Sequence, residues 1–243
     1  MRTRLFGAIM LGFITAPAHA QLPVSLRECI EAKDEAAALH YCSRVATGPG
    51  LEENKTIAAI KASHILRTRG DFDKALALLE PRRFGADIDE EIGHVWFDQG
   101  DHTMADLHYE RALDAGLDPN QETRRRMAVA AHSYGEKLQY SEQAPARAIN
   151  EYTRSLALDP DHLPALLGRA EALQKLNRHD SALTDLDRAI ALGADWSAYL
   201  LRARSRQTLG DKAGAIADFR RVLEENPKHI GARKALADLS TLP

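Results

Sequence analysis

The residues best suited to chemistry in this chain of 243 residues are its ten histidines. One of them closes the motif Glu91-Ile-Gly-His94, which puts a carboxylate and an imidazole on one face of a helix. Helical bundles that bind two irons carry this motif twice with further glutamates, whereas it occurs once here. The sequence lacks the phosphate-binding glycine loops, nucleophile elbows and H-E-x-x-H motifs of common enzymes. We therefore expect no catalytic residue, no metal and no cofactor, and an enzyme ranks third among the functions considered.

Other charged clusters are interpreted as solvated surface. The pairs Asp185/Asp187 and Glu224/Glu225 lie on an expected helix or at its end, where exposed carboxylates are common. The run Arg124–Arg126 begins another expected helix. It is either a solvated basic face or a docking spot for an acidic partner.

The only two cysteines, Cys29 and Cys42, lie on either side of the turn in an expected helical hairpin over residues 21–47. Positions symmetrical about a turn face one another, so the two should form a disulfide in an oxidising compartment. Closing a loop of this size stabilises a protein by about 3 kcal/mol. The alternative, a redox-active pair, lacks the usual C-x-x-C spacing.

Residues 1–20 have the features of a secretory signal. They combine a basic start, an apolar run from Leu5 to Ala16, and small residues, Ala18 and Ala20, before the expected cleavage point. The apolar run is too short to span a bilayer. We expect cleavage before Gln21 and export, most simply to a bacterial periplasm, with no membrane span afterwards.

The charge balance disfavours nucleic acid as a partner. Lysine and arginine number 32 against 35 acidic residues, and signal cleavage would remove two arginines. Phosphate backbones are bound by clustered positive charge, which a net acidic chain does not offer.

The elements that position these residues belong to an internal repeat. From Ala198 to Pro227 the chain predicts two helices joined by a turn at Gly210, and a shift of 33 residues finds the same pattern upstream. Three equivalent positions recur in every repeat, and the residues at each position are called a column here. They are a small residue in each first helix (Ser63, Gly93, Ala131, Ala170, Ala203), a small residue in each second helix (Ala75, Ala105, Ala148, Ala182, Ala215), and a bulky residue after it (Leu79, Tyr109, Tyr152, Leu186, Phe219).

These units, for example Gly93…Trp96…Gly100-Asp101…Ala105…Tyr109, resemble tetratricopeptide repeats from about residue 54 onward. Three departures stand out. Pro81 should shorten the second helix of the first unit, the turn between Tyr134 and Ala148 should be expanded, and Asn177 replaces the usual turn glycine.

The resemblance implies an all-α fold, a right-handed α-solenoid of about five repeats, with the disulfide-pinned hairpin at one end. The final helix should cap the solenoid. The expected repeats cover residues 56–85, 86–120, 121–162, 163–195 and 196–229, and the cap covers residues 230–243.

In this family the residue after each small first-helix position faces a concave groove. The residues that the resemblance places there are His64, His94, His132, Glu171 and Arg204. Polar neighbours should be Asp87, Glu90, Asp98, Lys175 and Gln207, and apolar contacts Ile57, Ile60, Phe97, Leu167 and Leu200. We expect the nearby carboxylates to raise the histidine pKa values, so that an acidic ligand binds more tightly in mild acid. The alternative is that these are ordinary polar residues on a wet surface.

The resemblance implies a module that binds an extended peptide or a partner helix in its groove. The second hypothesis is an assembly factor or chaperone for an envelope enzyme or a c-type cytochrome. It rests on resemblance alone, since the chain has no C-x-x-C-H motif.

Overall fold

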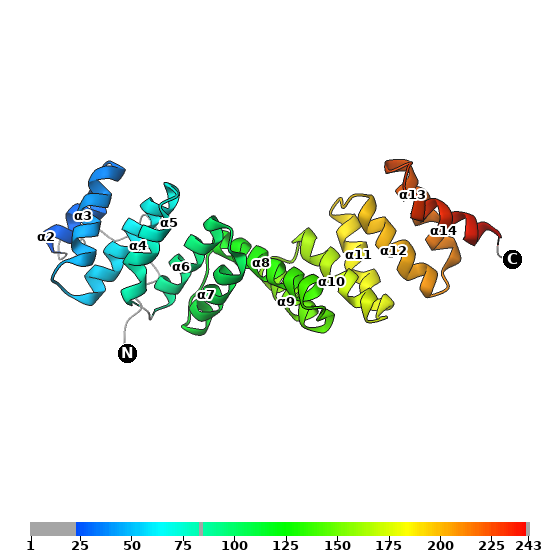
Figure 1. The fold of residues 1–243 in the computed structure, drawn as a ribbon, viewed down its shortest axis with the longest axis horizontal. Helices are drawn as coiled ribbons and strands as arrows, with labels where there is room; N and C mark the ends of the chain where they lie inside the picture. The colour runs from blue at the N-terminus through cyan, green and yellow to red at the C-terminus, as the bar shows by residue number, and fades with distance from the viewer. Residues whose placement is uncertain (1–22, 83–84, 242–243) are drawn as a thin grey trace. The chain divides into compact units, whose positions relative to one another are not determined.

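The structure, a computed structural model, describes residues 23–82 and 85–241. All regular secondary structure in these residues is helical, as expected (Figure 1). The chain divides into two compact units, residues 1–126 and 127–243. The expected secretory signal lies outside the described residues. Within the described part, no helix combines the length and apolar character needed to cross a membrane.

Unit 1 contains helices α2 (Val24–Glu31), α3 (Glu35–Thr47), α4 (Glu52–Thr68), α5 (Phe72–Leu79), α6 (Ala86–Gln99), α7 (His102–Asp114) and the first residues of α8 (Gln121–Glu136). The helices from α2 to α7 each pack on the next one along the chain (Figure 1). A short 3-10 helix, η2 (Glu80–Arg82), follows α5.

Unit 2 continues the same arrangement. It contains the rest of α8, the π-helix η3 (Lys137–Ser141), α9 (Pro145–Leu158), α10 (Leu163–Lys175), α11 (His179–Ala191), α12 (Trp196–Thr208), α13 (Lys212–Glu225) and α14 (Ile230–Thr241). In both units the helices pair in sequence, for example α6 with α7 and α12 with α13.

Short polar residues set the helix boundaries. Asp101 and Asp211 cap α7 and α13 by accepting backbone N–H groups of Met104 (3.0 Å) and Gly214 (2.9 Å). At the turn before α11, Asn177 adopts φ 57°, the left-handed conformation that glycine usually provides in such turns. Asn177 therefore replaces glycine in conformation as well as in sequence.

The three columns of the repeat form the core. The small first-helix and second-helix residues are all buried, and so are the bulky residues that follow them. The expected cap is also confirmed, since Ala232 and Leu239 of α14 are buried while Lys234 is exposed.

Two expectations about helix ends need correction. The segment between the expected hairpin (residues 21–47) and the expected first repeat (residues 56–85) is partly helical, because α4 begins at Glu52. Acidic residues in its first turn favour this early start. The segment from Tyr134 to Ala148 is largely helix rather than an expanded turn, because α8 continues into η3 and α9 then begins at Pro145. The expected shortening at Pro81 is confirmed, since α5 ends at Leu79.

The hairpin of α2 and α3 is fixed to the first repeat at several points. Cys29 and Cys42 form the expected disulfide, and both are fully buried. Lys61 of α4 donates to the Ile30 carbonyl at the end of α2, and Arg82 donates to the Ala46 carbonyl in α3. These bonds satisfy helix carbonyls that would otherwise lack partners.

Candidate functional site

The expected groove residues lie on the first helices of the repeats, α4, α6, α8, α10 and α12. Those of α4 and α6 belong to unit 1, and His132 and the residues of α10 and α12 belong to unit 2. The two sets are therefore built separately.

Arg67 is the centre of the polar cluster in unit 1. Its side chain, 7% exposed, donates from Nε to Glu91 Oε1 (3.3 Å) and from Nη1 to Asp98. Its Nη2 donates to His64 Nδ1 (2.8 Å). Arg67 thus ties α4 to α6 through two carboxylates and occupies one imidazole nitrogen.

His64 is consequently held in its neutral form. An arginine only donates hydrogen bonds, so His64 Nδ1 must accept. Burial lowers the pKa of His64, and the positive charge of Arg67 lowers it further. The expected rise in pKa is wrong for this histidine. Its ring is partly buried and bonded to Arg67, and the nearby Asp98 carboxylate is itself paired with arginines.

Glu91 is a buried acid rather than half of a metal-binding motif. Burial raises its pKa, and Arg67 opposes the rise. Ser63 also donates to the Glu91 carboxylate (3.3 Å). Since His94 bonds to Tyr109 instead, the two ends of the Glu91-x-x-His94 motif serve different partners.

Asp98 joins the same cluster to the start of α8. Arg126 Nη1 donates to Asp98 Oδ1 (2.7 Å), and its guanidinium lies over the Phe97 ring, 5.2 Å from the centroid. The His102 ring also stacks on Phe97, with 4.8 Å between the ring centroids. Burial alone would raise the pKa of Asp98, but Arg67 and Arg126 hold it below its usual value. Phe97 is thus covered by its own neighbours.

His94 and Glu90 form a second group beside the first. His94 Nδ1 lies 2.8 Å from the Tyr109 hydroxyl, and Thr123 donates to Glu90 Oε1 (2.7 Å). Burial would raise the pKa of Glu90, yet hydrogen bonds from His94 and Thr123 bring it below its usual value. Burial raises the pKa of Asp87, and the Glu90 charge adds to this rise. Most polar groove residues expected in unit 1 therefore already have hydrogen-bond partners within that unit.

The basic run at the start of α8 divides between two environments. Arg124 bonds to the Pro119 carbonyl (2.9 Å) and to Asp118 (3.3 Å), and Arg125 is exposed. Arg126 is half-buried in the cluster around Asp98. A uniformly solvated basic face is therefore the wrong interpretation of this run.

In unit 2, His132 is packed among its own neighbours. Its ring lies 5.7 Å from the Tyr152 ring and 5.3 Å from the His162 ring, and Nδ1 is 3.9 Å from Glu136 Oε2. Burial lowers the pKa of His162. His132 lies in unit 2, whereas His64 and His94 lie in unit 1, where His64 bonds to Arg67 and His94 bonds to Tyr109.

The remaining expected groove residues of unit 2 are more accessible. Lys175 Nζ lies 3.3 Å from Glu171 Oε1, and both side chains are partly exposed. Arg204 and Gln207 of α12 are exposed. Arg204 has no ion-pair partner within the part of unit 2 that the structure describes. Leu167 and Leu200 are partly buried and pack on the core.

Sequence analysis missed two arginine–aspartate pairs that recur one repeat apart. Arg169 donates to both carboxylate oxygens of Asp185 (2.8 and 2.7 Å), and Arg202 does the same to Asp218 (2.9 and 2.7 Å). Asp185 is buried, so its interpretation as solvated surface is wrong, whereas Asp187 is exposed. Glu224 and Glu225 are exposed, as expected. In both pairs the arginine precedes the aspartate by 16 residues, and the two pairs lie one repeat apart. This recurrence in the sequence could have predicted the pairing.

Tyr152 shows why glycines occur inside these helices. A Cβ atom built on Gly135 or on Gly168 would come within 2.7 Å of the Tyr152 ring. The ring is fully buried, and it fits only because neither glycine has a side chain. Gly135 therefore permits close packing inside α8 and marks no turn.

Helix pairs in sequence and repeated small residues at their crossings define a helix-turn-helix repeat protein. A tetratricopeptide repeat-like domain matches residues 18–157, and two tetratricopeptide repeat models match residues 139–205 and 197–229. The chain belongs to the tetratricopeptide repeat family.

Individual relatives share only part of their length with this chain. The Hsp70-Hsp90 organizing protein of Triticum aestivum is 29% identical over 92 residues, which are 37% of this chain and 16% of that protein. Hsc70-interacting protein 1 of Drosophila melanogaster is 34% identical over 94 residues, 38% of this chain and 23% of that protein. The chain thus spans less than a quarter of either relative.

Among solved structures, the crystal structure of YrrB, described as a TPR protein with an unusual peptide-binding site, is similar in fold. It is 19% identical, covers 76% of this chain and 94% of its own, and has a TM-score of 0.55. At this identity the likeness supports the fold alone.

Proposed function

We propose that this protein is an exported binding module that holds an extended peptide or a helix of a protein partner on the first helices of its repeats. The observation that carries the proposal is the exposure of Arg204, Gln207 and Lys175 along α10 and α12. Arg204 serves no ion pair within the described part of its unit. Exposed polar groups beside partly buried leucines are typical of surfaces that fix a peptide by register and apolar contact.

The names of the relatives support a protein partner. One is named as an organizing protein for Hsp70 and Hsp90, and another is named for its interaction with Hsc70. Those activities belong to much longer proteins, so they support the class of partner and not its identity.

Export is the second part of the proposal. The buried disulfide between Cys29 and Cys42 supports an oxidising compartment, because cytosolic thiols are kept reduced. Mass spectrometry of the protein from its native compartment should find a chain that begins at Gln21. It should also be lighter than the reduced form by the mass of two hydrogens. An intact Met1 or free thiols would contradict export.

Site-specific crosslinking tests the binding surface. A photo-reactive amino acid at Gln207 on α12 should capture a protein partner in cells, whereas the same group at exposed Arg220 on α13 should not. Equal capture at both positions, or capture only at Arg220, would place the partner elsewhere.

A further inference from the structure

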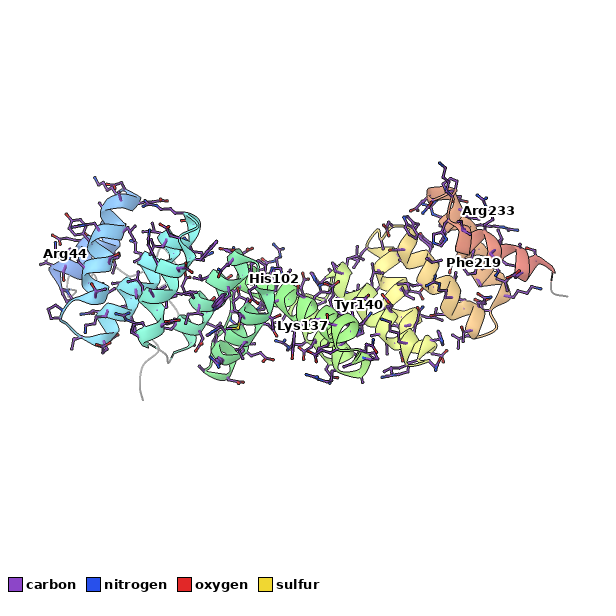
Figure 2. All side chains as sticks on the ribbon, in the orientation of Figure 1. Arg44, His102, Lys137, Tyr140, Phe219 and Arg233 are labelled. Atoms are coloured by element: carbon purple, nitrogen blue, oxygen red, sulfur yellow. A yellow bond between two sulfur atoms is a disulfide. The ribbon has the colours of Figure 1, made fainter. Side chains whose placement is uncertain are left out.

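The π-helix η3 is the least expected local structure in unit 2. It occupies Lys137–Ser141, between α8 and α9, the two helices of the third repeat. A π-helix is energetically poorer than an α-helix and often occurs at functional sites. Leu138 and Gln139 of this segment are buried, which anchors it. Figure 2 labels Lys137 and Tyr140 on the segment.

Tyr140 is held in place although it is exposed. Its side chain is 54% exposed, and its hydroxyl donates to Glu171 Oε2 (2.6 Å). Gln139 lies beneath it and, with its amide oriented to satisfy both ends, donates to the Tyr152 hydroxyl (3.2 Å). A rigid, exposed aromatic ring loses little entropy when a partner packs on it.

The chain places a cation of its own on this ring. Lys175 Nζ lies 4.5 Å from the Tyr140 ring centroid and 3.3 Å from Glu171 Oε1. Lys175 is the last residue of α10, and its side chain is 39% exposed. Ion pairs this accessible contribute little net stability. In the same orientation of its amide, the Gln139 oxygen accepts from Lys175 Nζ (3.3 Å) and from the Tyr140 hydroxyl (3.0 Å), so it keeps one donor when Lys175 moves into water.

Two carboxylates act on this ring. Of the lysines on η3 and at the end of α10, only Lys175 forms an ion pair with either carboxylate in the described residues. Glu171 bonds to the Tyr140 hydroxyl, and Glu136 lies one turn before Tyr140 with a side chain that is 51% exposed. The negative charges of both carboxylates contribute to raising the pKa of Tyr140, after burial. The only ion pair described for Glu136 is the long one to His132, at 3.9 Å.

The geometry points to the Tyr140 ring, with Glu136 and Glu171, as an anchor site for an arginine side chain of the protein partner, which Lys175 occupies while the partner is absent. This inference rests on the proposed function. An arginine suits the site better than the internal lysine, because a guanidinium stacks on an aromatic ring and pairs with a carboxylate through two hydrogen bonds.

Lys137 provides a matched control for this site. It is exposed on η3 and, in the described part of the chain, has no ion pair. Removing either lysine makes the local charge more negative by one unit. General electrostatic attraction therefore predicts the same effect for Lys137→Ala and Lys175→Ala, whereas displacement of Lys175 from the ring predicts a larger effect for Lys175→Ala.

The test measures binding of two short fluorescent peptides to the full mature chain. One alternates leucine with arginine and the other alternates leucine with glutamate. The arginine peptide should bind more tightly than the glutamate peptide. Tyr140→Leu, which keeps apolar area but removes the aromatic ring, should weaken the arginine peptide by about fivefold or more. Glu136→Gln should weaken it by about twofold to threefold.

Lys175→Ala should tighten binding of the arginine peptide by about threefold more than Lys137→Ala does. Because Tyr140 and Lys175 are exposed, helical circular dichroism should stay unchanged in these variants. Equal effects of the two lysine variants would overturn the inference. Preference for the glutamate peptide, lost in Lys175→Ala, would also overturn it while leaving the proposed function intact. Binding of neither peptide overturns the anchor site, and the Gln207 crosslink then decides the proposed function separately.

Discussion

At the scale of single residues, Arg67 binds side chains of unit 1 that were expected to face a partner, so these side chains stabilise the fold instead. Its guanidinium contacts Glu91, Asp98 and His64 from inside the unit. Arg67→Ala should lower the free energy of unfolding by about 3–5 kcal/mol, because it leaves the buried Glu91 carboxylate without its charged partner. Urea unfolding followed by circular dichroism measures this change.

The control for Arg67 is Arg69, two residues further along α4. Arg69 is exposed and pairs with exposed Glu35 at 3.3 Å. Exposed pairs contribute about 0–1 kcal/mol, so Arg69→Ala should have little effect. Similar losses in both variants would mean that the cluster around Arg67 adds no special stability.

His64 makes a prediction about pH. Its pKa in the folded chain lies below the ordinary value of 6.5, so below that pH the unfolded chain binds a proton that the folded chain refuses. Stability should therefore fall as pH drops below 6.5, toward the lower pKa of the folded state. The groups near His64 that bear on its charge are Arg67, His94, Asp98 and Arg126.

His64→Gln should lose less stability than the wild type when the pH is lowered from neutral to about pH 5. Unfolding free energies at a series of pH values test this, with exposed His40→Gln as a variant that also lacks one imidazole. A larger acid loss in His64→Gln than in the wild type would show that the charged imidazole is favoured after all.

At the scale of helices, Tyr152 determines how closely α10 approaches α9. A methyl group on Gly168 would come within 2.7 Å of its ring. Gly168→Ala should therefore destabilise the protein by about 1–3 kcal/mol, despite the better helix propensity of alanine. In a Tyr152→Leu background the same substitution should cost much less, since leucine leaves space there. Thermal unfolding of the four proteins gives this cycle, and additive effects would contradict the packing explanation.

The helices were predictable because their signals are local. Small residues such as Ala170 and Ala203 recur at a fixed interval, and burial confirms every member of these columns. Turn residues such as Asn177 also act within a few positions of themselves. The extra residues before α9 were expected, but their helical conformation was not, because it depends on Leu138 being buried in the packed unit.

The candidate site was only partly predictable, for a related reason. The repeat indicates which positions of successive units are equivalent, but it does not say which side chain reaches which neighbour. His64 was expected beside carboxylates, yet Arg67 one turn later occupies its Nδ1. Asp185 was expected to be solvated, yet it accepts a hydrogen bond from Arg169 of the preceding helix. These pairings depend on side-chain directions across two helices, which spacing along one helix does not determine.

At the scale of the whole molecule, we expect the two units to respond separately to a local loss of stability. In repeat proteins each helix pair contacts only its neighbours, so a local change spreads over a limited distance. The disulfide between Cys29 and Cys42 lies in the core of unit 1, where both cysteines pack beside Leu26 and Ala58. Its effect should therefore stay within that unit.

Replacing both cysteines, Cys29→Ala with Cys42→Ala, should lower the stability of unit 1 by about 3 kcal/mol, because the unfolded hairpin gains conformational freedom. Hydrogen exchange should show faster exchange in α2, α3 and α4, while α11, α12 and α13 of unit 2 keep their protection. The Arg202 to Asp218 pair, which lies within unit 2, provides the matched comparison. Arg202→Ala should speed exchange in α12 and α13 and leave α2 to α4 unchanged. If either variant speeds hydrogen exchange equally in both units, the chain unfolds as one cooperative body. The expectation that each unit responds separately is then wrong.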